Sequence, residues 1–236
     1  MNTRAVEEAV LDALRGGLIV SCQAEEGGPL DHPEILAAFA QCAVSAGAVG
    51  IRANHGRNIA AITQAVSVPV IGIKKRQVPP WPVYITPEFD DAREVVQAGA
   101  AIVAADATRR PRPVPFPVLV EAIHRDLGAL VMADCATLDE GLAAADAGAD
   151  LVATTMSGYT EDTAHRKVGP DLGLVEALAQ RVNCPVICEG RVHRPEEARA
   201  ALEAGAFAVV VGTAITSPAW IARQFVEALA AGRHSP

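Results

Sequence analysis

The sequence predicts an α/β fold, a single-domain (β/α)8 TIM barrel that spans residues 1–236 and carries an extra N-terminal helix. Three observations lead to this prediction: eight short apolar segments, helix-forming segments between them, and glycines where those helices end. Half of the 236 residues are hydrophobic and 20% are charged, which is enough apolar material for one large core. Barrels of about 250 residues form one domain, and no stretch of this chain has the composition of a linker.

The eight segments are apolar almost throughout instead of alternating with polar residues. They cover residues 18–22, 48–52, 68–73, 100–105, 129–133, 150–155, 185–189 and 207–212. This pattern is typical of strands buried on both faces, as in a parallel sheet covered by helices. It disfavours an antiparallel sandwich.

Helical spacing predicts helices between the strands, at residues 34–48, 90–100, 138–150 and 195–206. The last three share acidic openings, alanine-rich turns and a closing glycine, Gly99, Gly148 or Gly205, expected in a left-handed C-terminal cap. Right-handed crossovers then place the helices outside a parallel sheet. Eight strand–helix units of this kind close into a barrel, and residues 1–15 form the extra helix before the first strand. An open doubly wound sheet is the alternative, disfavoured because no GxGxxG follows the first strand.

Composition narrows the class of partner and the compartment. The net charge is −8 and no basic stripe is present, so nucleic acid is not expected to bind, whereas a local Lys/Arg cluster can still bind an anionic metabolite. No apolar run reaches the roughly 18 residues of a membrane span, and the polar start does not resemble a signal peptide, which predicts a cytoplasmic protein without membrane contact. Five cysteines without a CxxC pair indicate reduced thiols, with Cys22 and Cys188 in the core. Histidine spacing predicts no metal site.

Strand C-termini form the mouth of such a barrel, where catalytic residues lie. The polar or conformationally special residues expected there are Ser21, Gln23, Arg52, Asn54, Lys74, Lys75, Arg76, Asp106, Asp134, Thr154, Thr155, Glu189, Gly212 and Thr213. Ionisable groups at a barrel mouth are costly to bury, so this density favours a functional site.

Lys74 and Lys75 follow the third strand. Neighbouring positive charge and partial burial lower a lysine pKa, which makes the amine able to remove a proton or attack a carbonyl; the alternative is a solvated basic turn. Because side chains alternate along a strand, only one of the two lysines faces the barrel axis. Glu189 is either a general acid/base or an ion-pair partner of Lys75 or Arg52.

Two aspartates also end predicted strands. Asp106 has the same two interpretations as Glu189, acid/base catalysis or ion pairing. Asp134 is expected to cap the helix that starts near Ala136.

Glycines after the last two strands predict a phosphate site. Gly212 and Thr213 end the eighth strand and begin a short helical stretch, and Gly190 and Arg191 follow the seventh strand. Backbone N–H groups at a helix N-terminus hold phosphate in many barrel enzymes, although glycine also occurs at such turns for steric reasons alone.

Several motifs carry a family resemblance. GGLIVSCQA, GAVGIRAN, PVIGI followed by Lys-Arg, Asp-x-Thr with RPRP, MADCAT, TTxSGYT, VICEGR and VVVGTAIT occur in this order, from about Gly16 to Pro218. The chain resembles the N-acetylmannosamine-6-phosphate 2-epimerase family. The resemblance implies a (β/α)8 fold and interconversion of N-acetylmannosamine 6-phosphate and N-acetylglucosamine 6-phosphate in sialic acid catabolism, with no metal or nucleotide cofactor.

The resemblance also implies roles for particular residues. Lys75 corresponds to the family's catalytic lysine and Glu189 to its carboxylate partner, and Gln23, Arg52 and Asp106 fall on positions that contact the sugar.

Three departures from the family pattern stand out. Lys74 occupies a place that is commonly aliphatic, Ser217 replaces a common arginine, and QVPPWPVYIT follows Arg76 where an acidic residue is usual. Arg191 is a candidate for replacing the missing charge. Two other functions stay open: a Schiff-base lyase or synthase with Lys75 as nucleophile, and a non-catalytic sugar-phosphate-binding protein. A homodimer is a further expectation.

Overall fold

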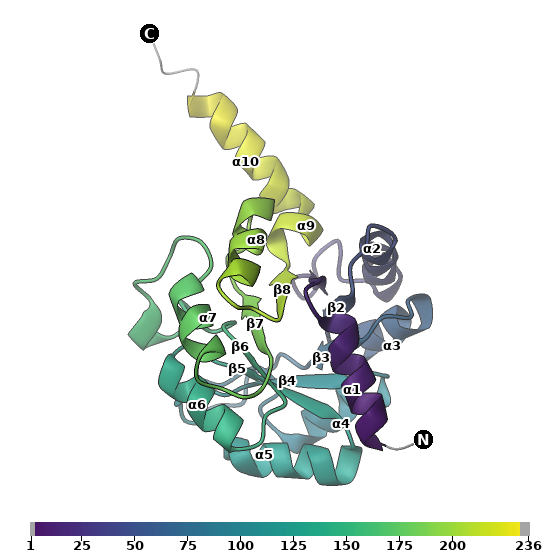
Figure 1. Cartoon of the computed structure of the whole chain (residues 1–236). Helices are drawn as coiled ribbons and strands as arrows, with labels where there is room; N and C mark the ends of the chain where they lie inside the picture. The colour runs from purple at the N-terminus through teal and green to yellow at the C-terminus, as the bar shows by residue number, and fades with distance from the viewer. Residues whose placement is uncertain (1–2, 232–236) are drawn as a thin grey trace.

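The computed structural model describes residues 3–231, and eight parallel strands close into a barrel (Figure 1). The strands are β1 (Leu18–Cys22), β2 (Gly50–Asn54), β3 (Val70–Ile73), β4 (Ile102–Asp106), β5 (Leu130–Asp134), β6 (Leu151–Ala153), β7 (Val186–Glu189) and β8 (Ala208–Val211). Each pairs in parallel with the next, and β8 pairs with β1 through Val20 and Val211. The predicted (β/α)8 barrel is confirmed, and the open sheet is excluded.

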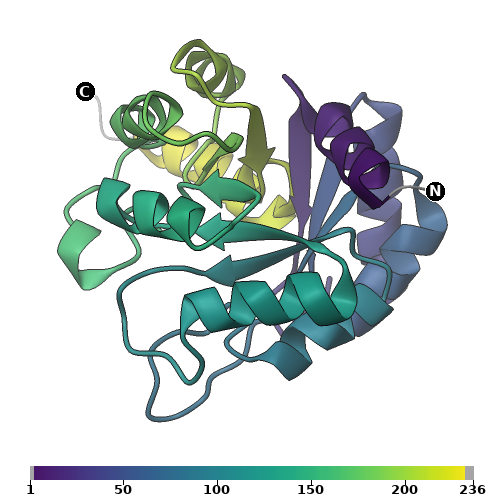
Figure 2. The same cartoon turned by 60° about the horizontal axis from the view of Figure 1, so that its bottom comes forward.

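Helices surround the barrel, as Figure 2 shows from another side. They are α1 (Thr3–Leu14), α2 (Pro33–Ser45), α3 (Gly56–Ala65), α4 (Phe89–Gln97), α5 (Phe116–Ala122) continued by a π-helical turn (Ile123–Leu127), α6 (Leu138–Asp146), a 3-10 turn (Glu161–Thr163), α7 (Leu172–Ala179), α8 (Pro195–Glu203), α9 (Thr213–Thr216) and α10 (Pro218–Ala231). The helices expected from spacing correspond to α2, α4, α6 and α8. Gly99, Gly148 and Gly205 have φ of +102°, +91° and +98°, the left-handed conformation expected after the helices.

The core has two layers. One lies between the strands and the surrounding helices, and the other fills the barrel, where Ile19, Ile71 and Ile102 are fully buried. Leu14 of α1 belongs to the inner layer, so the extra N-terminal helix closes the N-terminal end of the barrel. Gly50 allows this approach, because a Cβ there would meet the Leu14 side chain at 2.6 Å.

All strands except β1 begin or end one or two residues away from the prediction, and two of these differences bear on the site. β2 begins and ends two residues later than expected, which carries Arg52 to the middle of the strand instead of its end. β6 stops at Ala153, because the Thr154 hydroxyl donates to the carbonyl of Glu189 (3.0 Å) and the chain turns into the following loop. These shifts leave the mouth residues at the C-terminal end of the barrel.

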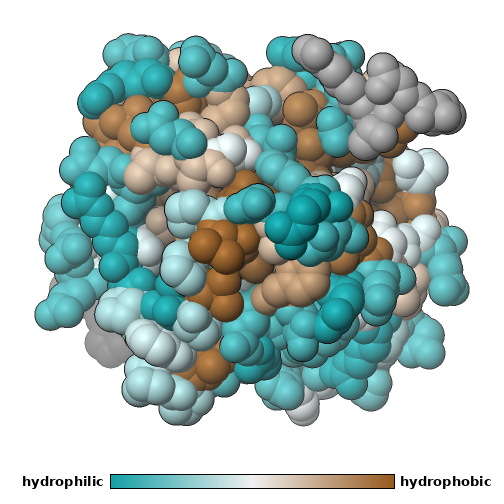
Figure 3. Space-filling view, turned by 90° about the horizontal axis from the view of Figure 1, so that it is seen from below, coloured by the Kyte–Doolittle hydropathy of each residue, from teal (hydrophilic) through white to brown (hydrophobic). Residues whose placement is uncertain are grey.

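Figure 3 shows the hydropathy of one face of the surface. Seen from below, it is mostly hydrophilic, with apolar side chains in smaller patches (Figure 3). Within residues 3–231, no helix has both the length and the apolar character needed to cross a membrane. All five cysteines are free thiols, and Cys22 and Cys188 are buried in the core as expected.

Candidate active site

A cavity of about 1090 Å³ opens at the C-terminal end of the strands. Its wall comes from segments that follow β1, β2, β3, β6, β7 and β8, together with the start of α10. The predicted site residues that line it are Gln23, Arg52, Lys75, Glu189, Gly190, Arg191, Gly212 and Thr213. Among the residues given a catalytic or binding role, Asp106 does not line the cavity. The other polar residues expected at the mouth that do not line it are Lys74, Arg76, Asp134 and Thr154.

Lys75 faces this cavity, and Lys74 points away from it. The Lys74 ammonium group pairs with Glu94 of α4 (2.9 Å), whereas the Lys75 ammonium group has no ion pair or hydrogen bond within residues 3–231. The backbone N–H of Lys75 donates to Asn54 Oδ1 (2.9 Å), which ties the lysine to the end of β2.

Water in the open cavity reaches Lys75, but the protein wall around the ammonium group removes much of its hydration. This desolvation, with the nearby positive charge of Arg52, lowers the pKa of Lys75. A larger fraction of the amine is therefore neutral than in a free lysine, and a neutral amine can accept a proton.

Arg52 is the centre of a buried ion cluster. Its side chain is 1% exposed, its two terminal nitrogens donate to the carboxylate of Asp134, and one of them also donates to Glu189. The Thr155 hydroxyl donates to Asp134 Oδ1 (2.7 Å) and completes the cluster. The Arg52 guanidinium is thus fixed by two carboxylates, while its Nε is buried without a partner.

The expectation that Asp134 caps a helix is wrong. Thr137 is the N-cap of α6, where its hydroxyl accepts from the N–H of Glu140 (3.3 Å). Asp134 ends β5 with a side chain that is 0% exposed, because the alternation of the strand turns it into the barrel toward Arg52.

Glu189 lies between Arg52 and the cavity. Burial and the negative charge of Asp134 raise the pKa of Glu189, and the Arg52 charge opposes this rise. The carboxylate pairs with Arg52, which is one of the two interpretations left open by the sequence, and its raised pKa favours the protonated form more than in a free glutamate. Among residues 3–231, no group of three His, Cys, Asp or Glu side chains is arranged to hold a metal ion.

Gln23, which follows β1, offers a free acceptor in the cavity. Its amide nitrogen donates to Ser21 Oγ (2.7 Å), which fixes the side chain, and its Oε1 is buried without a partner. A buried, unpaired acceptor is costly, so a donor group of a ligand would stabilise this position.

The predicted phosphate end of the cavity consists mainly of backbone. Thr213 begins α9, and the first N–H groups of a helix lack acceptors within it. Gly190 and Arg191 both have positive φ, +109° and +55°. The Arg191 guanidinium donates to the backbone carbonyls of Gly169 (2.8 Å) and Ser157, so it holds the loop after β6 in place.

Asp106 lies behind the cavity wall. Its carboxylate is 0% exposed and accepts from the backbone N–H and hydroxyl of Thr108 (3.0 and 2.6 Å) and from Arg110. Arg110 stacks over Tyr84, which does line the cavity, so Asp106 reaches the cavity only through these neighbours.

Sequence reasoning missed several aromatic and basic residues of the cavity. They are His55, Tyr84, Tyr159, His193, Trp220 and Arg223. A signal was present for two of them, since Trp220 and Arg223 follow Pro218 at the i, i+3 spacing that places residues on one helix face.

Residues 36–231 match the protein family NanE, described as "Putative N-acetylmannosamine-6-phosphate epimerase". The chain belongs to this family. Curated relatives with the corresponding 2-epimerase name come from Thermosynechococcus vestitus, 50% identical over 92% of this chain and 95% of its own, and from Caldanaerobacter subterraneus, 48% identical over 96% of both. The family assignment agrees with the resemblance found in the motifs.

Solved structures agree with the fold of this NanE-family chain. The N-acetylmannosamine-6-phosphate 2-epimerase from Clostridium perfringens superposes with a TM-score of 0.89 at 41% identity, covering 92% of this chain and 95% of its own. A thiamine phosphate pyrophosphorylase from Pyrococcus furiosus, at 18% identity and a TM-score of 0.61, shares the fold alone; it covers 98% of its own chain and 93% of this one.

Proposed function

We propose that this chain is an N-acetylmannosamine-6-phosphate 2-epimerase, an isomerase that interconverts N-acetylmannosamine 6-phosphate and N-acetylglucosamine 6-phosphate in amino-sugar catabolism. One observation carries the proposal beyond family membership. The cavity places an unpaired lysine of lowered pKa, Lys75, together with a carboxylate of raised pKa, Glu189. Groups whose pKa values are shifted toward neutrality in one cleft are suited to proton transfer.

The reaction inverts carbon 2 of the sugar, next to the aldehyde of its open-chain form. Neutral Lys75 takes the proton from carbon 2, and the electron pair of that C–H bond forms an enolate whose negative charge lies on the aldehyde oxygen. Return of a proton to the other face of carbon 2 restores the aldehyde with inverted configuration. The number of protons and electrons is unchanged over the cycle.

Other cavity residues stabilise and orient the intermediate. Glu189 exchanges a proton with the sugar oxygen, and the fixed positive charge of Arg52 favours the enolate. Gln23 Oε1 accepts a hydrogen bond from a hydroxyl or the acetamido N–H. The phosphate binds the backbone N–H groups near Gly190 and Thr213.

Proton NMR in deuterated water tests this function. Purified protein incubated with N-acetylmannosamine 6-phosphate is expected to yield N-acetylglucosamine 6-phosphate with deuterium at carbon 2, because a proton held on an amine exchanges with solvent. Borohydride is expected to trap no lysine adduct. Product that retains its original hydrogen, or a reduced Lys75 adduct, would instead support the Schiff-base alternative, and binding without turnover would support a non-catalytic protein.

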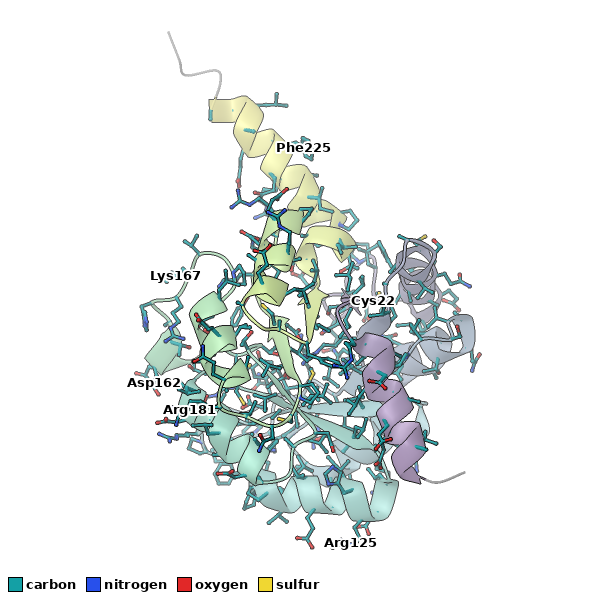
Figure 4. The ribbon with its side chains drawn as sticks, in the orientation of Figure 1. Cys22, Arg125, Asp162, Lys167, Arg181 and Phe225 are labelled. Atoms are coloured by element: carbon teal, nitrogen blue, oxygen red, sulfur yellow. The ribbon has the colours of Figure 1, made fainter. Side chains whose placement is uncertain are left out.

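We also propose that the chain forms a homodimer through α10. This helix projects from the barrel, and none of its residues is buried within the chain (Figure 4). Phe225, Val226 and Leu229 are 69%, 64% and 71% exposed and fall on one side of the helix. An exposed apolar stripe of this kind is typical of an interface.

Light scattering of the wild type and a Phe225→Asp/Leu229→Asp variant tests this assembly. The wild type is expected to have twice the mass of the chain, and the variant the mass of a single chain. A monomeric wild type would contradict the proposal. We place the enzyme in the cytoplasm, where its free thiols stay reduced.

A further inference from the structure

Four cationic side chains line the cavity, and three of them either have protein partners or serve as the proposed base. Arg52 is fixed by two buried carboxylates, Arg191 is bonded to backbone carbonyls, and Lys75 is the proposed base. Arg223 of α10 is the fourth, and its guanidinium has no ion pair or hydrogen bond within residues 3–231. A cavity-lining guanidinium without a protein partner is available to an anionic ligand.

The position of Arg223 connects it to the phosphate end of the cavity. Trp220 and Arg223 are three residues apart, so they lie on one face of α10. The Trp220 ring packs against His193, with ring centroids 4.7 Å apart, on the loop that also carries Gly190. This contact holds the first turn of α10 beside the backbone N–H groups of that loop.

Arg223 lies at the edge of the apolar stripe of α10. Steps of about 100° per residue place Arg223 about 160° from Phe225 and about 120° from Leu229, but only about 60° from Val226. Arg223 therefore lies beside Val226 and away from the other two apolar side chains.

The local charges favour a cation at this end. Glu25 and Glu26 line the cavity from the loop after β1, and both repel a phosphate dianion. Ser217, where α9 gives way to α10, contributes only a neutral hydroxyl, which accepts from the N–H of Trp220 (3.4 Å). Two nitrogens of Arg191 donate to backbone carbonyls, whereas every donor of the Arg223 guanidinium is free of partners within residues 3–231, so Arg223 can contact the phosphate with its whole guanidinium.

We propose that Arg223 binds the substrate phosphate, and that it supplies the cationic contact that Ser217 cannot make. The proposal rests on the proposed function for the identity of the substrate. A guanidinium contacts two phosphate oxygens at once, which also fixes the orientation of the sugar phosphate in the cavity. Because the phosphate keeps its charge throughout the reaction, this contact strengthens binding equally in the ground state and the transition state.

Steady-state kinetics of Arg223→Gln test this role. The variant is expected to raise KM for N-acetylmannosamine 6-phosphate about 5-fold to 20-fold and to leave kcat within about twofold of wild type, the pattern of lost uniform binding. The KM of Arg223→Lys is expected to lie between those of the wild type and Arg223→Gln. The double variant Ser217→Arg/Arg223→Gln is expected to recover most of the affinity for the substrate. Arg199→Gln is the matched control, since Arg199 lies on α8, is 76% exposed and pairs with Glu203 on the same helix.

Inorganic phosphate gives a readout that does not depend on turnover. Phosphate at tens of millimolar is expected to raise the melting temperature of wild type and the Arg199→Gln control, and to raise it much less in Arg223→Gln. An unchanged KM together with an unchanged phosphate effect in Arg223→Gln would overturn the proposal, as would a fall in kcat with KM unaltered. A wild type that does not epimerise the sugar would contradict the proposed function alone, because phosphate protection still tests Arg223.

Discussion

Replacing Asp134 by asparagine tests whether the buried ion cluster both stabilises the barrel and tunes the proposed catalytic groups. The asparagine keeps one acceptor oxygen for Arg52 and puts an NH2 group where the other oxygen was. One charge-assisted hydrogen bond to Arg52 is lost, worth about 1.5–3 kcal/mol. Removing a partner from a buried ion pair costs about 3–5 kcal/mol, but Glu189 still balances Arg52, so we expect a loss of about 3 kcal/mol.

Such a loss leaves a folded protein, because domains are stable by about 5–15 kcal/mol. For a chain of this size the melting temperature should fall by about 6–12 °C. Denaturant titration measures the free energy of unfolding, with Asp139→Asn as control, since Asp139 is 67% exposed and pairs with Arg109 at the surface, at 3.3 Å. Equal losses of unfolding free energy in Asp134→Asn and Asp139→Asn would show that the buried ion cluster does not stabilise the barrel.

The same variant has an expected effect on the pH dependence of turnover. The negative charge of Asp134 raises the pKa of both Lys75 and Glu189, so its removal lowers both. Turnover needs neutral Lys75, and the acidic limb of the kcat profile should therefore move to lower pH. A limb that moves to higher pH would contradict the assignment of Lys75 as the base.

Two further predictions concern single side chains. Lys75→Ala and Glu189→Gln should each lower kcat at least about 100-fold without unfolding the protein, whereas Lys74→Ala should keep most of the activity. An inactive Lys74→Ala together with an active Lys75→Ala would assign the role of base to Lys74. Asp150 raises the pKa of His124 by accepting a hydrogen bond (2.8 Å), so this pair stabilises the fold below about pH 6.5, the unfolded value, and the contribution is lost as pH rises through the higher folded pKa. Because the pair is partly exposed, His124→Gln should lower the free energy of unfolding by at most about 1 kcal/mol at pH 5.5 and by less at pH 8; an equal loss at both values would show that the charge is irrelevant.

The sequence predicted the barrel because its strands and helices leave local patterns. Runs such as Val70–Ile73 are apolar on both faces, and glycines such as Gly99 mark helix ends by their left-handed conformation. Both signals depend on neighbouring residues in the chain. The mouth residues followed from one topological rule, that strand C-termini share one end of the barrel.

Contacts across the barrel left no such pattern. Asp134 looked like a helix cap because Ala136 and a helix follow it, but its partner Arg52 is 82 residues away in sequence. Asp106 was expected in the cavity because it ends a predicted strand and by resemblance, but its carboxylate accepts hydrogen bonds from Thr108 and Arg110 instead. Asp134 is paired across the barrel, whereas Asp106 is paired with residues two and four positions further along the chain, and periodicity records neither pairing.

The buried cluster also explains how a basic barrel mouth can hold a lysine without an acidic partner. Arg52 alone would repel a protonated Lys75. Asp134 and Glu189 compensate the arginine, which leaves desolvation as the first cause of the lowered lysine pKa and the arginine charge as the second. The lysine pKa is thus lowered without removing the amine from the water and substrate that reach it through the open cavity. A carboxylate paired directly to Lys75 would have the opposite effect, because it would hold the ammonium form and block proton abstraction. The absence of a direct partner, within the part of the chain that the structure describes, is therefore the feature that the proposed reaction requires.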